Sequence, residues 1–240
     1  RLRPGSTDTP NQHIQARTAL VKGTGGQYRG GVVADAPVAY WRLGEASGTA
    51  LRSEVGGPDM NAVFRADQGT VRQSALDATG VFGVGDNRAV HLGRGGHIEV
   101  PGSLPKGTSE LSAEMWFRTS TPSAVLLGFQ NQPIGQTPTS WRPVLNIDGA
   151  GKLRGEFYLA DVSGATPIVS AQTVTDGEWH HVVLSASGTT QTLYLDGVKV
   201  GSLNGALTEQ ARPYAYIGGG YGSSGWMGLP ADTYYFKGDI

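Results

Sequence analysis

Two adjoining stretches of the sequence decide the fold: Asp176–Ser185 (DGEWHHVVLS) and Thr192–Gly201 (TLYLDGVKVG). The second stretch carries Asp196-Gly197 between two short runs that have the composition of β-strands. A type I′ hairpin turn needs positive φ at both central residues, which Asp tolerates and Gly adopts freely. The pattern therefore predicts an antiparallel hairpin with Asp196-Gly197 at its tip.

The same strand and turn signals recur through the rest of the chain. A second pair, Asp148-Gly149, predicts another hairpin tip between Val144–Ile147 and Leu153–Leu159. The other predicted strands are Ala16–Lys22, Val38–Leu43, Ala89–Leu92, His97–Val100, Leu111–Thr119, Val125–Phe129, Gln191–Leu195 and Val198–Ser202. No segment has the length and period of a convincing helix, so we expect an all-β protein.

One of these predicted strands shows clear period-two alternation. Its apolar residues Leu111, Ala113, Met115 and Phe117 share one face, which is predicted to lie in the core. The opposite face carries Trp116 among polar residues, so we expect that face to be partly covered.

The composition fits a β protein and excludes several classes of function. The 240 residues include 37 Gly and 13 Pro, and only 16% are charged, which is typical of strands joined by turns. A formal net charge of −1 gives no basic footprint for nucleic acid. Because there is no cysteine, thiol nucleophiles and Cys-ligated zinc are excluded. No apolar run resembles a membrane span or a signal peptide, so we expect no membrane insertion.

The pattern divides the chain into an arm and one main domain. Residues 1–33 are predicted to form an N-terminal arm or linker, or the end of a preceding domain, with a glycine-rich hinge at residues 23–31. Residues 34–240 are predicted to form two packed antiparallel sheets.

Several motifs resemble those of LamG-like jelly-roll domains in the concanavalin A-like lectin/glucanase superfamily. The two opening stretches resemble the hallmark hairpin of that family, and further matches follow in the family's order over residues 34–240. These are Tyr40–Glu45 (YWRLGE), Ala89–Gly93 (AVHLG), Ile98–Pro101 (IEVP) and Phe236–Ile240 (FKGDI). The resemblance implies an antiparallel two-sheet jelly-roll sandwich.

The stretch Ala34–Gly48 also resembles LamG-like domains in minor tail proteins of actinobacteriophages and in actinobacterial secreted proteins. This implies an extracellular or virion location. The leading hypothesis is a recognition module that binds a cell-surface glycan, within a phage tail protein or a secreted multidomain bacterial protein. The alternatives are a structural or decoration domain that packs on other subunits of a larger assembly, and a glucanase-like hydrolase.

The residues do not favour catalysis. Glycoside hydrolysis needs two carboxyl groups about 5–9.5 Å apart, yet Glu114 is followed at the same face by Trp116 and Arg118. Glu156 and Asp161 differ in parity and would point to opposite faces of one strand. We therefore predict no enzyme and no catalytic residues.

The pair His180-His181 does not predict a metal site, because neighbours on a strand point to opposite faces. The resemblance implies a structural role instead, with one histidine hydrogen-bonded to a neighbouring loop. It also implies a structural Ca²⁺ at the sheet margin, with Glu45, Gly48 and Asp239 at the ligand positions. Ser53 and Glu54 depart from the family's pattern there.

Glycan recognition commonly stacks a sugar on an aromatic ring beside polar side chains. Two loops meet this description, which makes Trp141, Arg142, Tyr221 and Trp226 the candidate ligand-binding residues. The alternative is that Trp141 and Trp226 fold inward and cap the ends of the sandwich.

In this family the closing strand, to which Tyr234–Ile240 corresponds, returns beside the first strand, Val38–Leu43. The sequence covers only part of the closing motif. We expect either that the natural polypeptide continues past Ile240, which the non-Met first residue Arg1 favours, or that a strand of an adjacent chain fills the gap.

Overall fold

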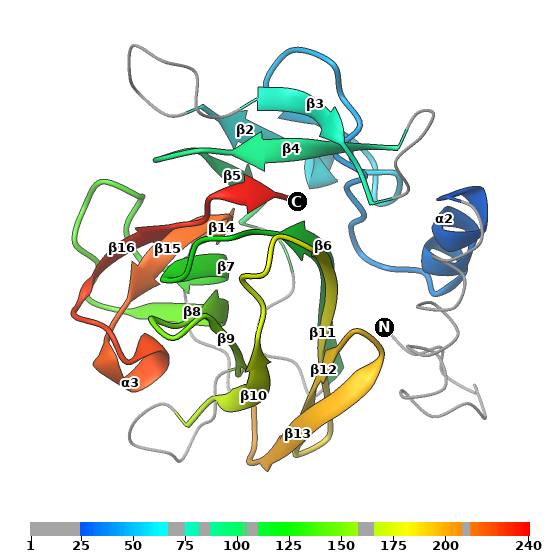
Figure 1. Cartoon of the computed structure of the whole chain (residues 1–240). Coiled ribbons are helices and arrows are strands. Elements are labelled where there is room, and N and C mark those ends of the chain that lie inside the picture. The colour runs from blue at the N-terminus through cyan, green and yellow to red at the C-terminus, as the bar shows by residue number, and fades with distance from the viewer. Residues whose placement is uncertain are drawn as a thin grey trace.

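A computed structural model describes residues 25–66, 75–81, 87–102, 104, 110–157, 166–207 and 212–240. Two antiparallel sheets face each other in this part of the chain, and a two-stranded sheet lies beside them (Figure 1). The expected antiparallel two-sheet sandwich is therefore confirmed. The predicted strand Ala16–Lys22 lies outside the described residues.

In both large sheets the spatial order of the strands differs from their order along the chain. Across the eight-stranded sheet the order is β1 (Ala50–Leu51), β2 (Ala62–Arg65), β5 (His97–Val100), β14 (Tyr214–Ile217), β7 (Ala124–Gln130), β8 (Trp141–Ile147), β9 (Lys152–Gly155) and β10 (Ile168–Thr173). Across the seven-stranded sheet it is β13 (Val198–Asn204), β12 (Thr190–Leu195), β11 (Trp179–Ser187), β6 (Glu110–Arg118), β17 (Gly238–Asp239), β4 (Arg88–Leu92) and β3 (Ala75–Thr79). The small sheet pairs β15 (Gly219–Gly222) with β16 (Asp232–Tyr235).

Both Asp-Gly pairs lie at hairpin connections, as predicted. Asp196 and Gly197 have φ of 51° and 79° between β12 and β13, which is the type I′ arrangement. The β8–β9 connection is built differently, because Asp148 accepts hydrogen bonds from the amides of Ala150 and Lys152, each at 2.9 Å. An Asx-type turn replaces the tight turn there.

The core lies between the two large sheets. Phe117 is fully buried and its ring meets Phe236 edge-on at 6.3 Å. The predicted alternation in β6 is confirmed, because Leu111, Ala113 and Met115 also pack against this core.

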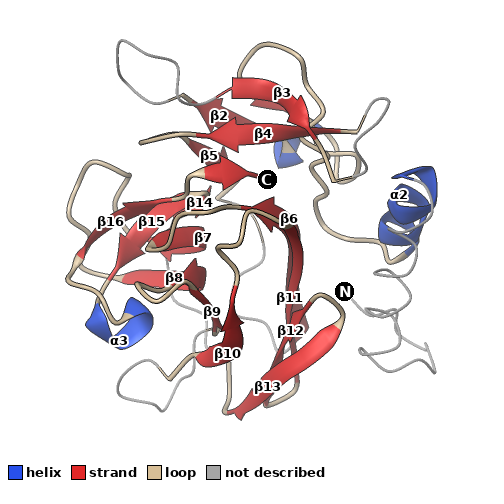
Figure 2. Cartoon of the chain, in the orientation of Figure 1, coloured by secondary structure: helices blue, strands red, loops and turns tan. Residues whose placement is uncertain are grey.

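The expected hinge is wrong for its described residues, because Gly25–Ala34 forms the helix α2 (Figure 2). Its buried residues Tyr28 and Val32 are four apart and so share one helix face. The Tyr28 hydroxyl donates a hydrogen bond of 2.7 Å to Glu114, and its ring meets Trp116 edge-on. Packing on β6 therefore outweighs the poor helix propensity of glycine, and it gives the predicted cover of Trp116.

The other described helices are short: the 3₁₀ helix Pro58–Met60 and α3 (Ser224–Met227). None of the helices that the structure describes is long and apolar enough to cross a membrane.

The predicted strand Val38–Leu43 is wrong, because within the described part of the chain it pairs only through a single bridge between Trp41 and Ser53. Positive φ at Ala36 and Leu43 turns the chain at both ends of the stretch, which keeps it out of a ladder. It is fixed instead by point contacts, such as the hydrogen bond from the Trp41 indole to the Met60 carbonyl at 2.7 Å.

The expected pairing of the closing strand with this stretch is also wrong. β17, the strand that ends at the C mark in Figure 1, instead enters between β4 and β6. Asp239 stands opposite both His91 and Arg118. Ile240 and Val90 exchange two backbone hydrogen bonds of 3.0 and 2.9 Å.

Candidate functional site

The outer face of the eight-stranded sheet carries a second, smaller apolar cluster. Along β7, Ala124 and Leu126 belong to the core, whereas Val125 packs with Trp226 and Met227. Alternate strand residues point to opposite faces, so β15, β16 and α3 cover the outer face of this sheet. Figure 1 shows these elements beside β7 and β8.

This cover comes very close to the sheet, and glycine allows it. A Cβ on Gly220 would lie 3.0 Å from a methyl group of Val125 and 3.6 Å from the Cα of Gly128. Gly220 also has φ of 158°. A larger residue there would lift the cover from β7.

The four residues predicted to bind ligand gather at this place, and we call them the aromatic cluster: Trp141, Arg142, Tyr221 and Trp226. The rings of Trp141 and Tyr221 meet edge-on, with centroids 4.9 Å apart. The guanidinium of Arg142 stands over the ring of Trp226 at 4.1 Å, a cation–π contact. Trp226 and Arg142 are only 7% and 9% exposed, whereas Trp141 and Tyr221 are partly exposed.

Thus Trp226 folds inward, whereas Trp141 and Tyr221 reach the surface. The alternative that both tryptophans fold inward therefore describes only Trp226. Ligand binding by the cluster stays a prediction.

The loop before Trp141 is held by its own hydrogen bonds. The side-chain oxygen of Asn131 accepts from the amides of Thr139 and Ser140 at 3.1 and 3.0 Å. On the other side of the loop, the amide of Ile134 donates to the hydroxyl of Tyr216. This support fixes the position at which Trp141 begins β8.

A buried carboxyl group, Glu156, lies near Arg142, a neighbour that the sequence did not predict for it. Glu156 is 1% exposed, and its carboxylate accepts a hydrogen bond of 2.9 Å from the amide of Thr166. Burial raises the pKa of Glu156 to about 7, although the Thr166 amide and the charge of Arg142 both act to lower it. Only the geometry could reveal this pair of neighbours, because Glu156 and Arg142 come from adjacent segments of the fold rather than from one motif.

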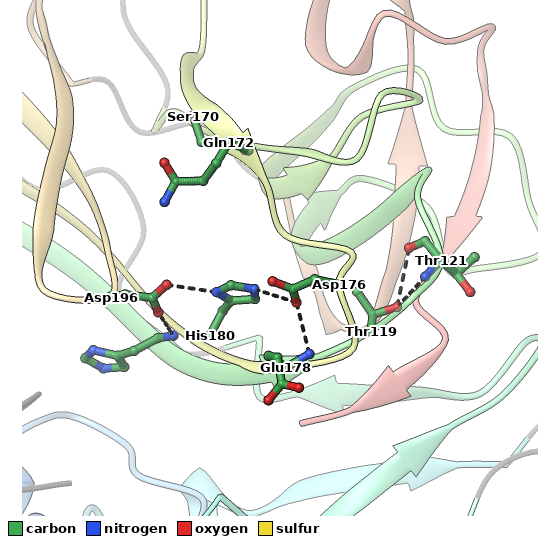
Figure 3. A network of polar contacts seen from close by, with 9 residues as sticks. Thr119, Thr121, Ser170, Gln172, Asp176, Glu178, His180 and Asp196 are labelled. Atoms are coloured by element: carbon green, nitrogen blue, oxygen red, sulfur yellow. Dashed lines mark hydrogen bonds and ion pairs between the residues drawn. The ribbon is translucent and has the colours of Figure 1, made fainter. Parts of the chain in front are cut away.

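One histidine of the pair is hydrogen-bonded to a neighbouring loop, as the resemblance implies. His180 lies between two carboxylates, with Nδ1 2.8 Å from Asp196 and Nε2 3.1 Å from Asp176 in the preceding loop (Figure 3). His181 contacts Glu114 at 3.0 Å and stacks on Trp116. The two imidazoles thus have different partners. The hydrogen bond that the His180 imidazole donates to the Asp196 carboxylate is the main cause that raises the pKa of His180.

We expect Asp196→Asn to lower the free energy of unfolding by about 1 kcal/mol at pH 5.5, and by less at pH 9. Asn tolerates the positive φ at this position, so the change removes mainly the charge. Because the folded-state pKa of His180 is raised, its pairing stabilises the protein fully below the unfolded pKa, near 6.5, and is lost as pH rises through the folded pKa. Denaturant unfolding at both pH values measures this; an equal loss at each would contradict the charged pair.

The positions predicted for calcium do not fit one shared ion. One carboxylate oxygen of Asp239 forms an ion pair with the guanidinium of Arg118 at 2.6 Å, and the other contacts the His91 imidazole at 2.7 Å. One oxygen of Glu45 accepts the amide of Arg52, while the other is buried without a hydrogen-bond partner among the described residues. Gly48 is exposed. The described residues hold no group of three or more metal-ligating His, Asp or Glu, and calcium binding stays a prediction.

Comparison with protein families matches residues 92–240 to the concanavalin A-like lectin/glucanases superfamily. Comparison with curated proteins found no match. Among solved structures, the chain is similar to domain 4 of AbnA, an extracellular family 43 arabinanase from Geobacillus stearothermophilus in complex with arabinotriose. That similarity has 14% identity, covers 74% of this chain and 78% of the other, and has a TM-score of 0.45.

The chain is also similar to domains LG4-5 of the mouse laminin α1 chain, with 19% identity, coverage of 60% of this chain and 40% of the other, and a TM-score of 0.42. The family match extends from β4 to Ile240 and so takes in both hairpins and the aromatic cluster. The chain belongs to the concanavalin A-like lectin/glucanase superfamily.

Proposed function

We propose that this chain is a non-catalytic module that binds carbohydrate through the aromatic cluster. The observation that carries the proposal is the position of Trp141 and Tyr221, two partly exposed rings that meet edge-on beside the buried Arg142–Trp226 pair. Membership of a superfamily of lectins and glucanases supports carbohydrate as the chemical class of the ligand.

The geometry suits a sugar for two reasons. The apolar face of a pyranose or furanose ring stacks on an aromatic ring, and its hydroxyl groups bond to nearby polar groups. Trp141 and Tyr221 are held by each other and by the Asn131 loop, so binding orders few side chains.

Hydrolysis lacks support from the same residues. Glu156 has the raised pKa of a general acid, yet it is 1% exposed, and among the described residues the charged group that acts on it is Arg142 rather than a second acid. Asp161 lies outside the described residues. Other acids are held by arginine, including Glu99 with Arg65 and Asp148 with Arg154. A glycosidase needs one carboxylate free to act as base or nucleophile beside its acid.

The wider role we propose is adhesion to cell-surface glycans, with the module displayed outside the cell on a secreted multidomain bacterial protein or on a phage tail. The resemblance of Ala34–Gly48 to such proteins supports this setting.

The test is a glycan array probed with the purified chain, followed by calorimetric titration with the oligosaccharide that binds most strongly. We expect Trp141→Ala and Tyr221→Ala each to weaken binding at least about tenfold, which is the loss of roughly one stacking contact. Trp141→Phe and Tyr221→Phe keep a ring and are the matched controls, with affinity near that of the wild type. Unchanged binding by both alanine variants would refute the site.

A further inference from the structure

Tyr214 is an exposed aromatic residue on the outer face of the eight-stranded sheet, apart from the aromatic cluster. Its neighbours Ala215 and Ile217 in β14 belong to the core, so Tyr214 and Tyr216 point outward. Tyr216 is 1% exposed, whereas Tyr214 is 38% exposed. Among the described residues, Tyr214 is the one aromatic ring in the group of exposed large hydrophobic side chains.

The ring of Tyr214 is held in a fixed orientation. It lies parallel to the ring of Tyr216, with an angle of 3° between the planes and 6.5 Å between the centroids, which is an offset stack. Tyr216 in turn meets His97 edge-on at 5.5 Å, and its hydroxyl accepts a hydrogen bond from the amide of Ile134. A ring that is fixed in advance loses little conformational freedom when a ligand binds.

Tyr214 stands in line with the aromatic cluster. It pairs with Gln130 of β7, and Gln130 pairs with Trp141 of β8, so the three side chains share one row on the outer face. Figure 1 shows β14, β7 and β8 one beside another. Two strand spacings separate Tyr214 from Trp141, which is roughly 10 Å. A single sugar ring does not cover that span, whereas successive sugars of one chain do.

Gln130, between the two rings, ties this surface together. It is 1% exposed, its side-chain oxygen accepts the amide of Tyr221 at 3.0 Å, and its side-chain nitrogen donates to the carbonyl of Gln132 at 2.8 Å. The same residue therefore fixes a ring of the aromatic cluster and the start of the loop after β7. That loop carries the exposed side chains of Gln136 and Thr137, which can bond to sugar hydroxyl groups.

A polar pair lies on the other side of Tyr214. Glu99 stands directly opposite Tyr216 and so lies diagonal to Tyr214, at about 7–8 Å, a separation that long side chains bridge. Nε and Nη2 of Arg65 both donate to the same oxygen of Glu99, at 2.9 and 2.7 Å. The second carboxylate oxygen and Nη1 take no part in these bonds, so the pair offers an acceptor beside a donor. Its two charges offset each other, which suits hydroxyl groups better than an anion.

We infer that Tyr214, Glu99 and Arg65 form a second sugar subsite, so that the outer face binds an extended, neutral oligosaccharide across its strands. The inference rests on the proposed function of the aromatic cluster, whose two rings bind one end of that chain. Tyr214 stacks on a sugar near the other end, and Glu99 and Arg65 bond to its hydroxyl groups. Four strand spacings lead from β8 to β2, which is roughly 19 Å or the length of about four sugar units.

The first experiment is a calorimetric titration of the purified chain with cello-, laminari-, xylo- and manno-oligosaccharides of two to six sugars. In a series that binds, we expect the affinity to rise at least about tenfold from the disaccharide to the tetrasaccharide, because a second stacking contact is added. Beyond the tetrasaccharide we expect no further rise. An affinity that does not change with length would overturn the second subsite.

The second experiment repeats the titration with variants. Tyr214→Ala is expected to lower the affinity for the tetrasaccharide about tenfold and to leave that for the disaccharide unchanged, while Tyr214→Phe, the matched control, keeps both. Arg65→Ala removes an exposed side chain and tests the polar half of the subsite, with an expected loss of at least about threefold for the tetrasaccharide alone. Should Tyr214→Ala fail to fold, Arg65→Ala decides the same question.

Trp141→Ala separates this inference from the proposed function, because it is expected to weaken binding at every length. If Trp141→Ala does so while Tyr214→Ala and Arg65→Ala bind the tetrasaccharide like the wild type, the second subsite is overturned and the proposed function stands. If no series binds, or if Trp141→Ala changes nothing, the proposed function fails and the second subsite with it. Tighter binding of a heparin tetrasaccharide than of every neutral tetrasaccharide would overturn the neutral chain.

Discussion

Replacing Gly238 with alanine is expected to destabilise the protein by about 3–5 kcal/mol, since backbone strain and overpacking add at this position. Gly238 has φ of 151°, which L side chains rarely adopt. An added Cβ would overlap the carbonyl oxygen of Arg118 and would lie 3.0 Å from the ring of Phe236. The carbonyl belongs to β6, so the clash would push β17 away from its neighbour.

The matched control is Gly135→Ala, at φ of 98° with no atom within 4 Å of the added Cβ. That variant carries backbone strain without a clash, and we expect a loss of only about 1–2 kcal/mol. Urea unfolding measures both variants. Equal losses would mean that backbone strain alone explains the destabilisation by Gly238→Ala, and that β17 tolerates displacement from β6.

This result would explain the motif Phe236–Ile240 in physical terms. Phe236 is buried in the core, Gly238 allows the close approach to β6, and Asp239 joins Arg118 and His91. The motif brings the chain into the middle of the seven-stranded sheet. Its position between β4 and β6 followed from no sequence signal, because pairing partners are set by the whole fold.

Local signals predicted the strands whose patterns are strong on their own. The tip at Asp196-Gly197 follows from the φ preferences of two residues, and the inner face of β6 follows from alternation. The glycine-rich strand β15 carries no such signal. Position 220 requires glycine because an added Cβ would press on Val125 and Gly128 of β7. That contact joins segments that are far apart in the sequence, so no local pattern predicts it.

The helix α2 and the candidate site also depend on contacts that local sequence signals do not predict. Glycine-rich sequence disfavours a helix, and packing against the rest of the fold, including that of Tyr28 against β6, stabilises one. For the aromatic cluster, loop composition predicted four candidate residues, but it did not show that Arg142 covers Trp226. Nor did it place Glu156 beside them.

The largest pH effect is expected from Glu156, and it should oppose the usual behaviour of an acidic residue. Burial raises its folded-state pKa to about 7, whereas the unfolded value is near 4.5. Between these values the folded state binds one more proton than the unfolded state, so stability falls as pH rises, by about 1.4 kcal/mol per pH unit. Stability is therefore greatest below pH 4.5 for this group, and is lost progressively up to about pH 7.

Glu156→Gln imitates the protonated side chain and keeps an oxygen that can accept the Thr166 amide. We expect the variant to match the wild type at pH 4.5 and to exceed its free energy of unfolding by about 2–3 kcal/mol at pH 8. His180 also loses its stabilising pairing as pH rises, but it does so in both proteins, so the difference between their free energies of unfolding isolates Glu156.

Glu178→Gln removes a charge from an exposed position and is the control. Denaturant unfolding at several pH values gives the two curves. If the variant is less stable than the wild type at pH 8, then the Glu156 carboxylate is charged and paired with Arg142 strongly enough to overcome the cost of its burial.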